Sequence, residues 1–255
     1  MPLEITLTLC GFSFVAGFID AVVGGGGLIQ LPALLVFCPS WPHTTALGTN
    51  KFASLAGTLV ALLRYLRSIK LERRIALPSA VTAVVGSVIG AWCVSLLSPD
   101  FFRPLVIVLL IGVAIYSWKK KKLGGDHKPK LRGTQELITA LVVALSLGFY
   151  DGFFGPGTGT FLLFLYIGVF GYNFIIGSAY AKVVNLSTNA GALSFFIATG
   201  SVNYSLAIPM ALAQIVGGYT GAHVAIKKGA PFVRILFLIV VSALILRLLM
   251  LELGY

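Results

Sequence analysis

Long apolar runs recur from one end of the 255-residue chain to the other, and they constrain the fold more than any other feature. A run of roughly 20 apolar residues can cross the hydrocarbon core of a bilayer as a helix. The chain is 58% hydrophobic and 11% charged, whereas about a quarter of the residues are charged in soluble domains. We therefore predict an all-α polytopic membrane protein with apolar runs at 5–37, 44–66, 77–97, 104–118, 134–170, 174–199, 205–226 and 232–250.

The basic residues lie between these runs. Most of the 19 Lys and Arg residues, which give the chain a net charge of +11, fall in segments 64–74, 119–132 and 227–234. Cytoplasmic loops of membrane proteins carry such an excess of Lys and Arg. We therefore expect these segments to set the topology and to meet lipid headgroups, and we expect no nucleic-acid partner.

A glycine-rich motif occurs twice. GFIDAVVGGGG at 17–27 recurs as GFYDGFFGPGTG at 148–159, at an offset of 131 residues. We predict two homologous transmembrane repeats, 1–118 and 133–255, joined by a basic cytoplasmic linker at 119–132. Internal repeats with broken helices at matching positions are typical of secondary transporters.

The charge of matching loops predicts opposite orientations for the two halves. Loop 64–74 is basic, whereas its counterpart near 195–205 has no charge. Segment 98–103 is neutral overall, whereas its counterpart 227–234 is basic. If basic loops are cytoplasmic, the repeat is inverted and both termini are periplasmic.

The two longest apolar runs, 5–37 and 134–170, have glycines in their middle. Each inverted half must cross the membrane an odd number of times, so we expect both runs to break at these glycines in mid-membrane. The free N–H groups at the start of the second half-helix attract anions. Irregular backbone at that depth must line a cavity or be buried in protein. Close helix packing is the alternative role for glycine, and it suits the pair Gly86/Gly90 better.

Few ionisable side chains remain inside the apolar runs: Asp20, Lys51, Asp151 and Lys182. The offset of the repeat aligns the two aspartates with each other and the two lysines with each other. Burying such groups costs several kcal/mol, which makes each of them a functional candidate. The lysines are expected to bind an anion, and the aspartates to couple transport to protons or to form ion pairs. A purely structural alternative pairs Asp20 with Lys51 and Asp151 with Lys182.

The predicted substrate-binding groups combine the lysines, the backbone amides of the glycine motifs and nearby polar side chains: Lys51, Lys182, Gly24, Gly25, Gly26, Gly27, Asn50, Gly155, Gly157, Thr158, Gly159, Asn185 and Asn189. Asn185 and Asn189 follow Lys182 by three and seven residues, which places all three on one helix face. No catalytic residue, metal or cofactor is predicted. No GxxxxGK[ST] motif is present, so we expect no direct coupling to ATP.

The segments GFIDAVVGGGGLIQLPALL, GTNKFAS, GFYDGFFGPGTGTF and AKVVNLSTNAGAL resemble the TauE/SafE sulfite-exporter family of bacterial membrane proteins, and most closely its YfcA-like branch. The resemblance covers nearly the whole chain. It implies a multi-pass permease of the bacterial inner membrane for small sulfur-containing anions such as sulfite, sulfoacetate, taurine-related sulfonates and thiosulfate. The second glycine motif departs from an unbroken run at Pro156 and Thr158, so the two halves are expected to contribute unequally to the site.

These features together predict a secondary transporter and not an enzyme, which moves a small anion such as a sulfur oxyanion or organosulfonate. An anion channel is one alternative. An intramembrane aspartyl protease is another, because two carboxylates that share a proton perform that chemistry. The protease is disfavoured, since both aspartates lie in copies of one motif and the lysines would have no role. The expected partners are the anion and the lipid bilayer, and self-association into a homo-oligomer is left open.

Overall fold

The computed structural model describes residues 2–98 and 127–252, with side chains as far as residue 228. The described residues form helices and no strands, as the sequence predicts. The helices are α1 (Leu3–Val23), α2 (Gly27–Phe37), α3 (His43–Leu66), α4 (Arg73–Ser95), α6 (Gly133–Phe153), α7 (Thr158–Gly168), α8 (Phe174–Ala198) and α9 (Tyr204–Glu252). The predicted run 104–118 and most of the predicted linker 119–132 lie outside the described residues.

The two longest apolar runs are broken at their glycines, as predicted. In the first half, α1 ends where Gly24 adopts a left-handed backbone with φ of 84°. In the second half, Gly155 and Gly157 are left-handed, with φ of 95° and 87°. Glycine adopts this conformation without the steric cost that a Cβ would impose. Each break is followed by a helix of 11 residues, α2 or α7.

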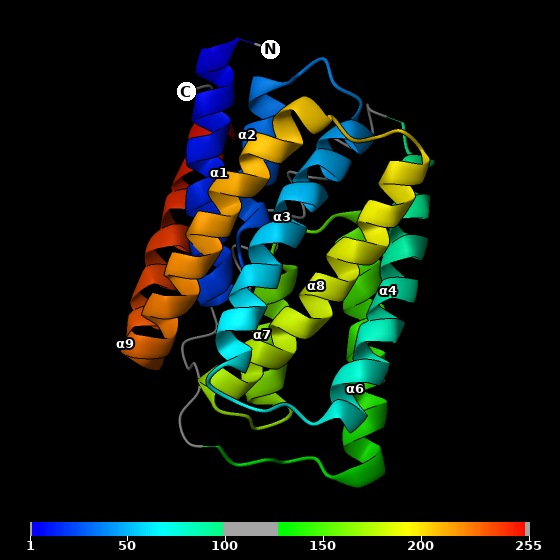
Figure 1. Ribbon diagram of the computed structural model, residues 1–255, viewed down its shortest axis with the longest axis vertical. Coiled ribbons are helices and arrows are strands. Elements are labelled where there is room, and N and C mark those ends of the chain that lie inside the picture. Colours follow the sequence, from blue (N-terminus) through cyan, green and yellow to red (C-terminus); the bar gives the residue numbers. More distant parts are fainter. Residues whose placement is uncertain (1, 99–126, 253–255) are drawn as a thin grey trace.

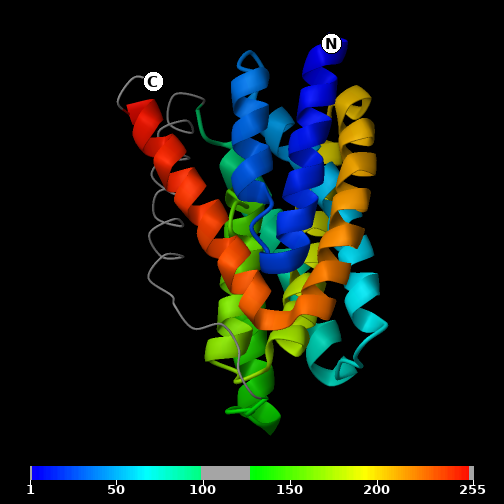
Figure 2. The same cartoon turned by 90° about the vertical axis from the view of Figure 1, so that its left-hand side faces the viewer.

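The broken runs form two helical hairpins that point toward each other. The hairpin α1–α2 opens toward the end of the molecule that holds the first turn of α1, and α6–α7 opens toward the opposite end (Figures 1 and 2). An 11-residue helix is about 16 Å long, about half the thickness of a bilayer core, so neither α2 nor α7 spans it alone. By contrast, α1, α3, α4 and α6 are long and apolar enough to cross a membrane.

The tips of the hairpins meet inside the molecule. A Cβ added to Gly24 would lie 2.2 Å from the carbonyl carbon of Gly159, and one added to Gly27 would lie 3.2 Å from the Cα of Pro156. The Thr160 hydroxyl donates a hydrogen bond of 3.1 Å to the carbonyl of Val23. The two glycine motifs, far apart in sequence, therefore form one continuous contact.

The hairpin of each half packs on a helix of the other half. Helix α1 lies along α9 and α6 lies along α4, while α3 and α8 cross between them (Figure 1). Small residues allow this close approach. A Cβ on Gly90 would lie 2.1 Å from the carbonyl oxygen of Phe149, and one on Gly217 would lie 2.1 Å from that of Phe14. Glycine pairs of the kind at Gly86 and Gly90 therefore serve helix packing, as expected.

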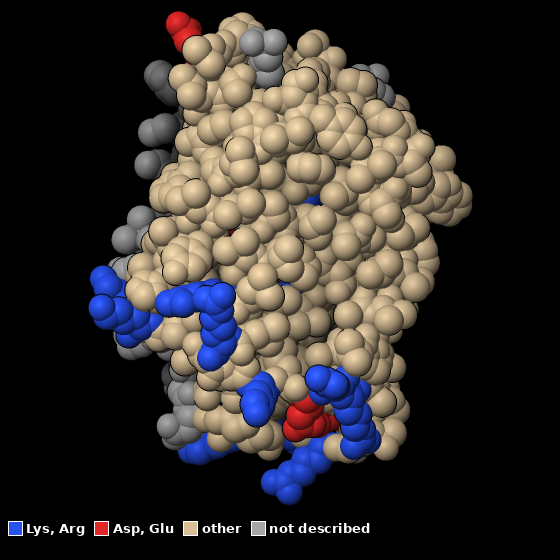
Figure 3. Space-filling view, viewed as in Figure 1, with Lys and Arg blue, Asp and Glu red and all other residues tan. Residues whose placement is uncertain are grey.

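The outer surface suits a bilayer. Exposed apolar side chains follow α4 at helical spacing: Leu77, Val81, Val85, Ile89 and Trp92. Figure 3 shows a broad surface without charges, and Lys and Arg gather toward the end of the molecule opposite the first turn of α1. These basic side chains come from the end of α3, the start of α4, the approach to α6 and the middle of α9, where Lys227 and Lys228 lie.

The contact between the hairpin tips leads to a stability prediction. We expect Gly159→Ala to destabilise the protein by about 1–3 kcal/mol, because its Cβ would overlap the backbone of Gly24 and force one tip to move. The matched control is Gly168→Ala in the same helix, where nothing lies within 4 Å of the added Cβ. Thermal unfolding of the purified variants in detergent measures the difference, and equal unfolding temperatures would refute this contact.

Candidate functional site

A small cavity lies where the two hairpin tips meet α3 and α8. The centre of a water molecule can occupy about 20 Å³ of this cavity, so the cavity has room for one or two water molecules. Polar and charged groups and glycine backbone make up nearly all of its wall: Asp20, Gly24, Gly27, Asn50, Lys51, Ser54, Asp151, Gly155, Gly157, Gly159, Asn185 and Asn189. Most of the residues predicted to bind substrate therefore come together around one space.

Lys51 of α3 pairs with Asp151 of α6. Their Nζ and Oδ2 atoms are 2.6 Å apart, and both side chains are almost completely buried. The ammonium group also lies against the second glycine motif, because a Cβ on Gly155 would be 2.9 Å from Lys51 Nζ. A glycine at this position lets the lysine approach the tip of the opposing hairpin.

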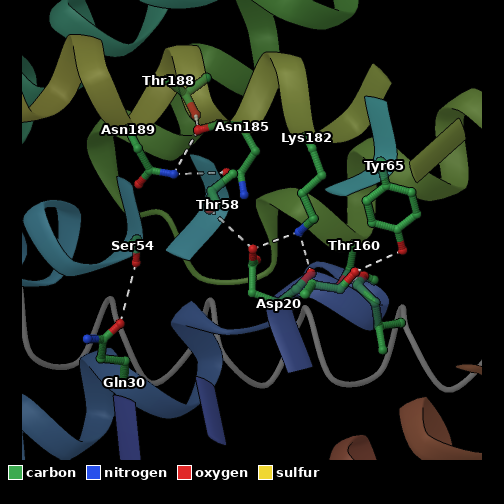
Figure 4. Close-up of polar contacts among 12 residues, drawn as sticks. Asp20, Gln30, Ser54, Thr58, Tyr65, Thr160, Lys182, Asn185, Thr188 and Asn189 are labelled. Carbon is green, nitrogen blue, oxygen red and sulfur yellow. Dashed lines mark hydrogen bonds and ion pairs between the residues drawn. The ribbon is translucent and has the colours of Figure 1, made fainter. Parts of the chain in front are cut away.

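Lys182 of α8 pairs with Asp20 of α1. Its Nζ donates to Asp20 Oδ2 at 2.7 Å and also to the backbone carbonyl of Asp20 (Figure 4). The hydroxyl of Thr58 on α3 donates to the same carboxylate oxygen at 3.3 Å. Asp20 is 8% exposed and Asp151 is 2% exposed, so Asp20 is the more open of the two buried acids.

The ion pairs cross between the halves, and the pairing expected from the sequence is wrong. Neither Asp20–Lys51 nor Asp151–Lys182 forms an ion pair; each aspartate instead meets the lysine of the other half. The physical reason is the arrangement of the hairpins. Because their tips meet head to head, the acid at each tip lies beside the crossing helix of the opposite half.

The polar face predicted on α8 is present. Asn185 and Asn189 line the cavity, and Asn189 Nδ2 donates to the backbone carbonyl of Asn185 at 2.7 Å (Figure 4). On α3, Ser54 and Thr58 stand at the matching positions, three and seven residues after Lys51. Neither was among the predicted site residues, although the spacing that identified the two asparagines also selects them. Ser54 lines the cavity, and Thr58 anchors Asp20.

The N-termini of two helices point into this region. Neither α2 nor α7 has a side-chain cap at its first turn, and Gly27, Gly157 and Gly159 of these turns line the cavity. The first turn of a helix carries the positive end of the helix dipole. In these two turns, the N–H groups of Leu28, Ile29 and Thr158 donate to the carbonyls of Gly25, Gly26 and Gly155. Two such ends therefore add positive potential to the two ammonium groups.

Four of the predicted residues lie outside the cavity wall. Gly26 packs against Ala16 and the Cβ of Asp20, and Gly25 lies near Thr160. The hydroxyl of Thr158 donates to the carbonyl of Gly155 at 2.7 Å, and so stabilises the turn. The fourth, Lys182, reaches the site through its ion pair with Asp20.

The formal charges of the site balance. Two ammonium groups face two carboxylates, and each lysine is already paired. A buried charge without a partner is costly, so an incoming anion must separate an ion pair or be accompanied by a cation.

Comparison with known proteins bears on this arrangement. The model of the family described as sulfite exporter TauE/SafE matches residues 9–248. A protein of a Sinorhizobium species named "probable membrane transporter protein ORF9" is 36% identical over 93% of this chain and 89% of its own length. The Escherichia coli K12 protein named "probable membrane transporter protein YfcA" is 32% identical over 93% of this chain and 87% of its own length. No solved structure gives a significant match.

Proposed function

The chain belongs to the TauE/SafE sulfite exporter family, and we propose that it is a secondary transporter that moves a small anion across the bacterial inner membrane. Apolar spans and relatives named as membrane transporters identify it as a multi-pass membrane protein. The observation that carries the proposal is the cavity between the hairpin tips, which is lined by the buried Lys51 and by the first turns of α2 and α7. Lys182 adjoins this cavity through its ion pair with Asp20.

The chemistry of this cavity favours an anion. Ammonium groups and helix N-termini bind negatively charged oxygens. The amides of Asn50 and Asn185 add neutral hydrogen-bond donors to the same wall. The Ser54 hydroxyl instead donates to Gln30, and the Asn189 amide donates to Asn185. The family description names sulfite, so we propose a sulfur oxyanion or an organosulfonate, such as sulfite or sulfoacetate, as the substrate.

Charge balance supports proton coupling. When an anion takes the place of a carboxylate beside a lysine, the released aspartate is left buried beside a new negative charge. Protonation of that aspartate removes the unfavourable charge. We propose that Asp20 or Asp151 takes up a proton as the anion binds, which couples the flux to the proton gradient.

The arrangement of helices supports an inverted repeat. The hairpins α1–α2 and α6–α7 open toward opposite ends of the molecule (Figures 1 and 2). The exposed basic side chains gather at one end, and the first turn of α1 lies at the other (Figures 1 and 3). Under the positive-inside rule, the basic end is cytoplasmic and the first turn of α1 is periplasmic.

The ion pairs argue against the protease alternative. An aspartyl protease needs two carboxylates that share one proton. Here Asp20 and Asp151 are each held by a lysine from a different helix, Lys182 or Lys51. The relatives, too, are named as membrane transporters.

An uptake screen tests the function. The full chain, reconstituted in proteoliposomes, is offered sulfite, sulfoacetate, taurine, thiosulfate and sulfate under an imposed proton gradient, and protein-free liposomes give the background. We expect at least one sulfur anion to enter with saturable kinetics, and dissipation of the gradient to slow its entry. Uptake no faster than into protein-free liposomes for every compound would contradict the proposal.

A further inference from the structure

A second, smaller cavity adjoins the Asp20–Lys182 pair. It lies between the end of α1, the first turns of α7 and the early part of α8, and Ser178, Leu163, Ala181, Asp20 and Lys182 are in its wall. About 10 Å³ is open to the centre of a water-sized sphere, close to what one water molecule needs. Asp20, Gly24 and Gly159 line both cavities and therefore separate them.

The second cavity lies toward the basic end of the molecule. Along α8 its residues Ser178 and Lys182 come first, followed by Asn185 and Asn189 of the larger cavity. Ser178 is only about 6 Å along the helix from the start of α8, which lies at the basic end (Figure 1). Ser178 and Asp20 therefore lie nearer to this end of the molecule than Asn185 and Asn189 do.

The second cavity contains a buried hydroxyl group, that of Ser178, which needs a hydrogen-bond partner. Its side chain is 3% exposed, and its hydroxyl makes no hydrogen bond of standard geometry to a residue that the structure describes, although it lies close enough to the Tyr65 hydroxyl to interact with it. The neighbouring Tyr65 hydroxyl donates its own proton to the carbonyl of Ala21 at 3.1 Å. Buried hydroxyls are nearly always hydrogen-bonded, to protein or to ordered water. A water molecule in the second cavity would satisfy Ser178.

This arrangement belongs to one half of the molecule only. The position in the first half that matches Ser178 is occupied by Leu47, which is fully buried and cannot hold a water. Asp20 lines both cavities, whereas Asp151 lines only the larger one. The two acids therefore differ in the space beside them, because Asp20 adjoins both cavities and Asp151 adjoins one of the two.

The charged and titratable groups around Asp20 come from two helices. Lys182 of α8 is its ion-pair partner, and Lys51 and Tyr65 of α3 lie close enough to act on it electrostatically. Helix α9 meets this part of α1 with Gly217 and Gly221. Helix α2 has no ionisable side chain, and that of Tyr166 on α7 lies in an aromatic cluster with Phe170, Tyr172 and Tyr180.

We propose that a water held by Ser178 passes a proton from the basic end of the molecule to Asp20, so that Asp20, and not Asp151, carries the coupling proton. The proton comes from a hydronium ion in bulk solvent, crosses the held water, which is regenerated, and binds to Asp20 Oδ2. Asp20 becomes neutral, while Lys182 keeps its charge and is freed to attract the anion. This inference rests on the proposed coupling role of the aspartates.

Infrared difference spectroscopy tests this route without any substrate. The full chain, in a supported bilayer, is perfused with buffers of stepped pH, and the band of protonated carboxyl groups is followed over time. Asp20→Asn and Asp151→Asn identify the residue that produces the band. We expect Asp20→Asn to remove the band and Asp151→Asn to retain it. Retention of the band in Asp20→Asn, or its absence at every pH, would overturn the proposal.

The kinetics of the band test the role of Ser178. We expect Ser178→Leu, which copies the first half, to slow the rise about tenfold, the effect of losing one net hydrogen bond from the path. Ser178→Ala leaves the space and removes the hydroxyl, so it provides the same test if the leucine variant does not fold. Leu47→Val is the matched control and should leave the rise unchanged. An unchanged rise in the Ser178 variants would refute the route. A normal band without anion flux would refute the proposed function alone.

Discussion

Lys182→Ala is expected to destabilise the fold by about 3–5 kcal/mol, because it leaves the carboxylate of Asp20 buried without its cationic partner. The structure predicts which second substitution restores stability. Asp20→Asn removes the unpaired charge and should recover most of the lost stability. Asp151→Asn should instead lower the stability further, because it leaves the ammonium group of Lys51 buried without its partner.

Denaturant or thermal unfolding of the purified variants in detergent measures this pattern. The mirror experiment uses Lys51→Ala, for which Asp151→Asn is the expected rescue and Asp20→Asn is not. Rescue of Lys182→Ala by Asp151→Asn would show that the pairs form within each half and would contradict the crossed arrangement.

The second large effect concerns transport. The double variant Lys51→Met/Asp151→Asn removes one ion pair without leaving an unpaired charge, so we expect it to fold. It also removes the lysine that lines the cavity, and anion flux should fall by about 100-fold. Flux assays in proteoliposomes at matched protein content measure the loss. Lys70→Met, at an exposed lysine of the basic end, serves as the control and should transport normally. Equal flux in the double variant and the wild type would show that Lys51 does not bind the anion.

Much of the fold could be predicted because the apolar runs and the repeated motif are strong local signals. Four glycines in the first motif, and Pro156 among the glycines of the second, are incompatible with a continuous helix, so both breaks follow from the sequence. The polar face of α8 follows from residue spacing alone. The same spacing on α3 identifies Ser54 and Thr58, but serine and threonine are common in membrane helices. The roles of these two residues become apparent only from the hydrogen bond of Thr58 to Asp20 and from the position of Ser54 in the cavity wall.

The partners within the site could not be predicted, because they depend on how the halves pack. An aspartate and a lysine from the same half are the natural guess when only the chain order is known. The guess fails because the tips of the two hairpins meet, which places Asp20 beside α8 and Asp151 beside α3. The second cavity could not be predicted either, because it forms only where Ser178 packs near Lys182 and the end of α1.

Sulfite counterflow tests the central claim most directly. Proteoliposomes loaded with excess unlabelled sulfite are diluted into a trace of sulfur-radiolabelled sulfite, with the wild type and the variant Lys51→Met/Asp151→Asn in parallel. A carrier with its site between the hairpin tips predicts transient accumulation of label in the wild type and none in the variant. Equal accumulation in both would contradict the site. Flux of label without accumulation would indicate a channel, and the absence of any flux would exclude sulfite as the substrate.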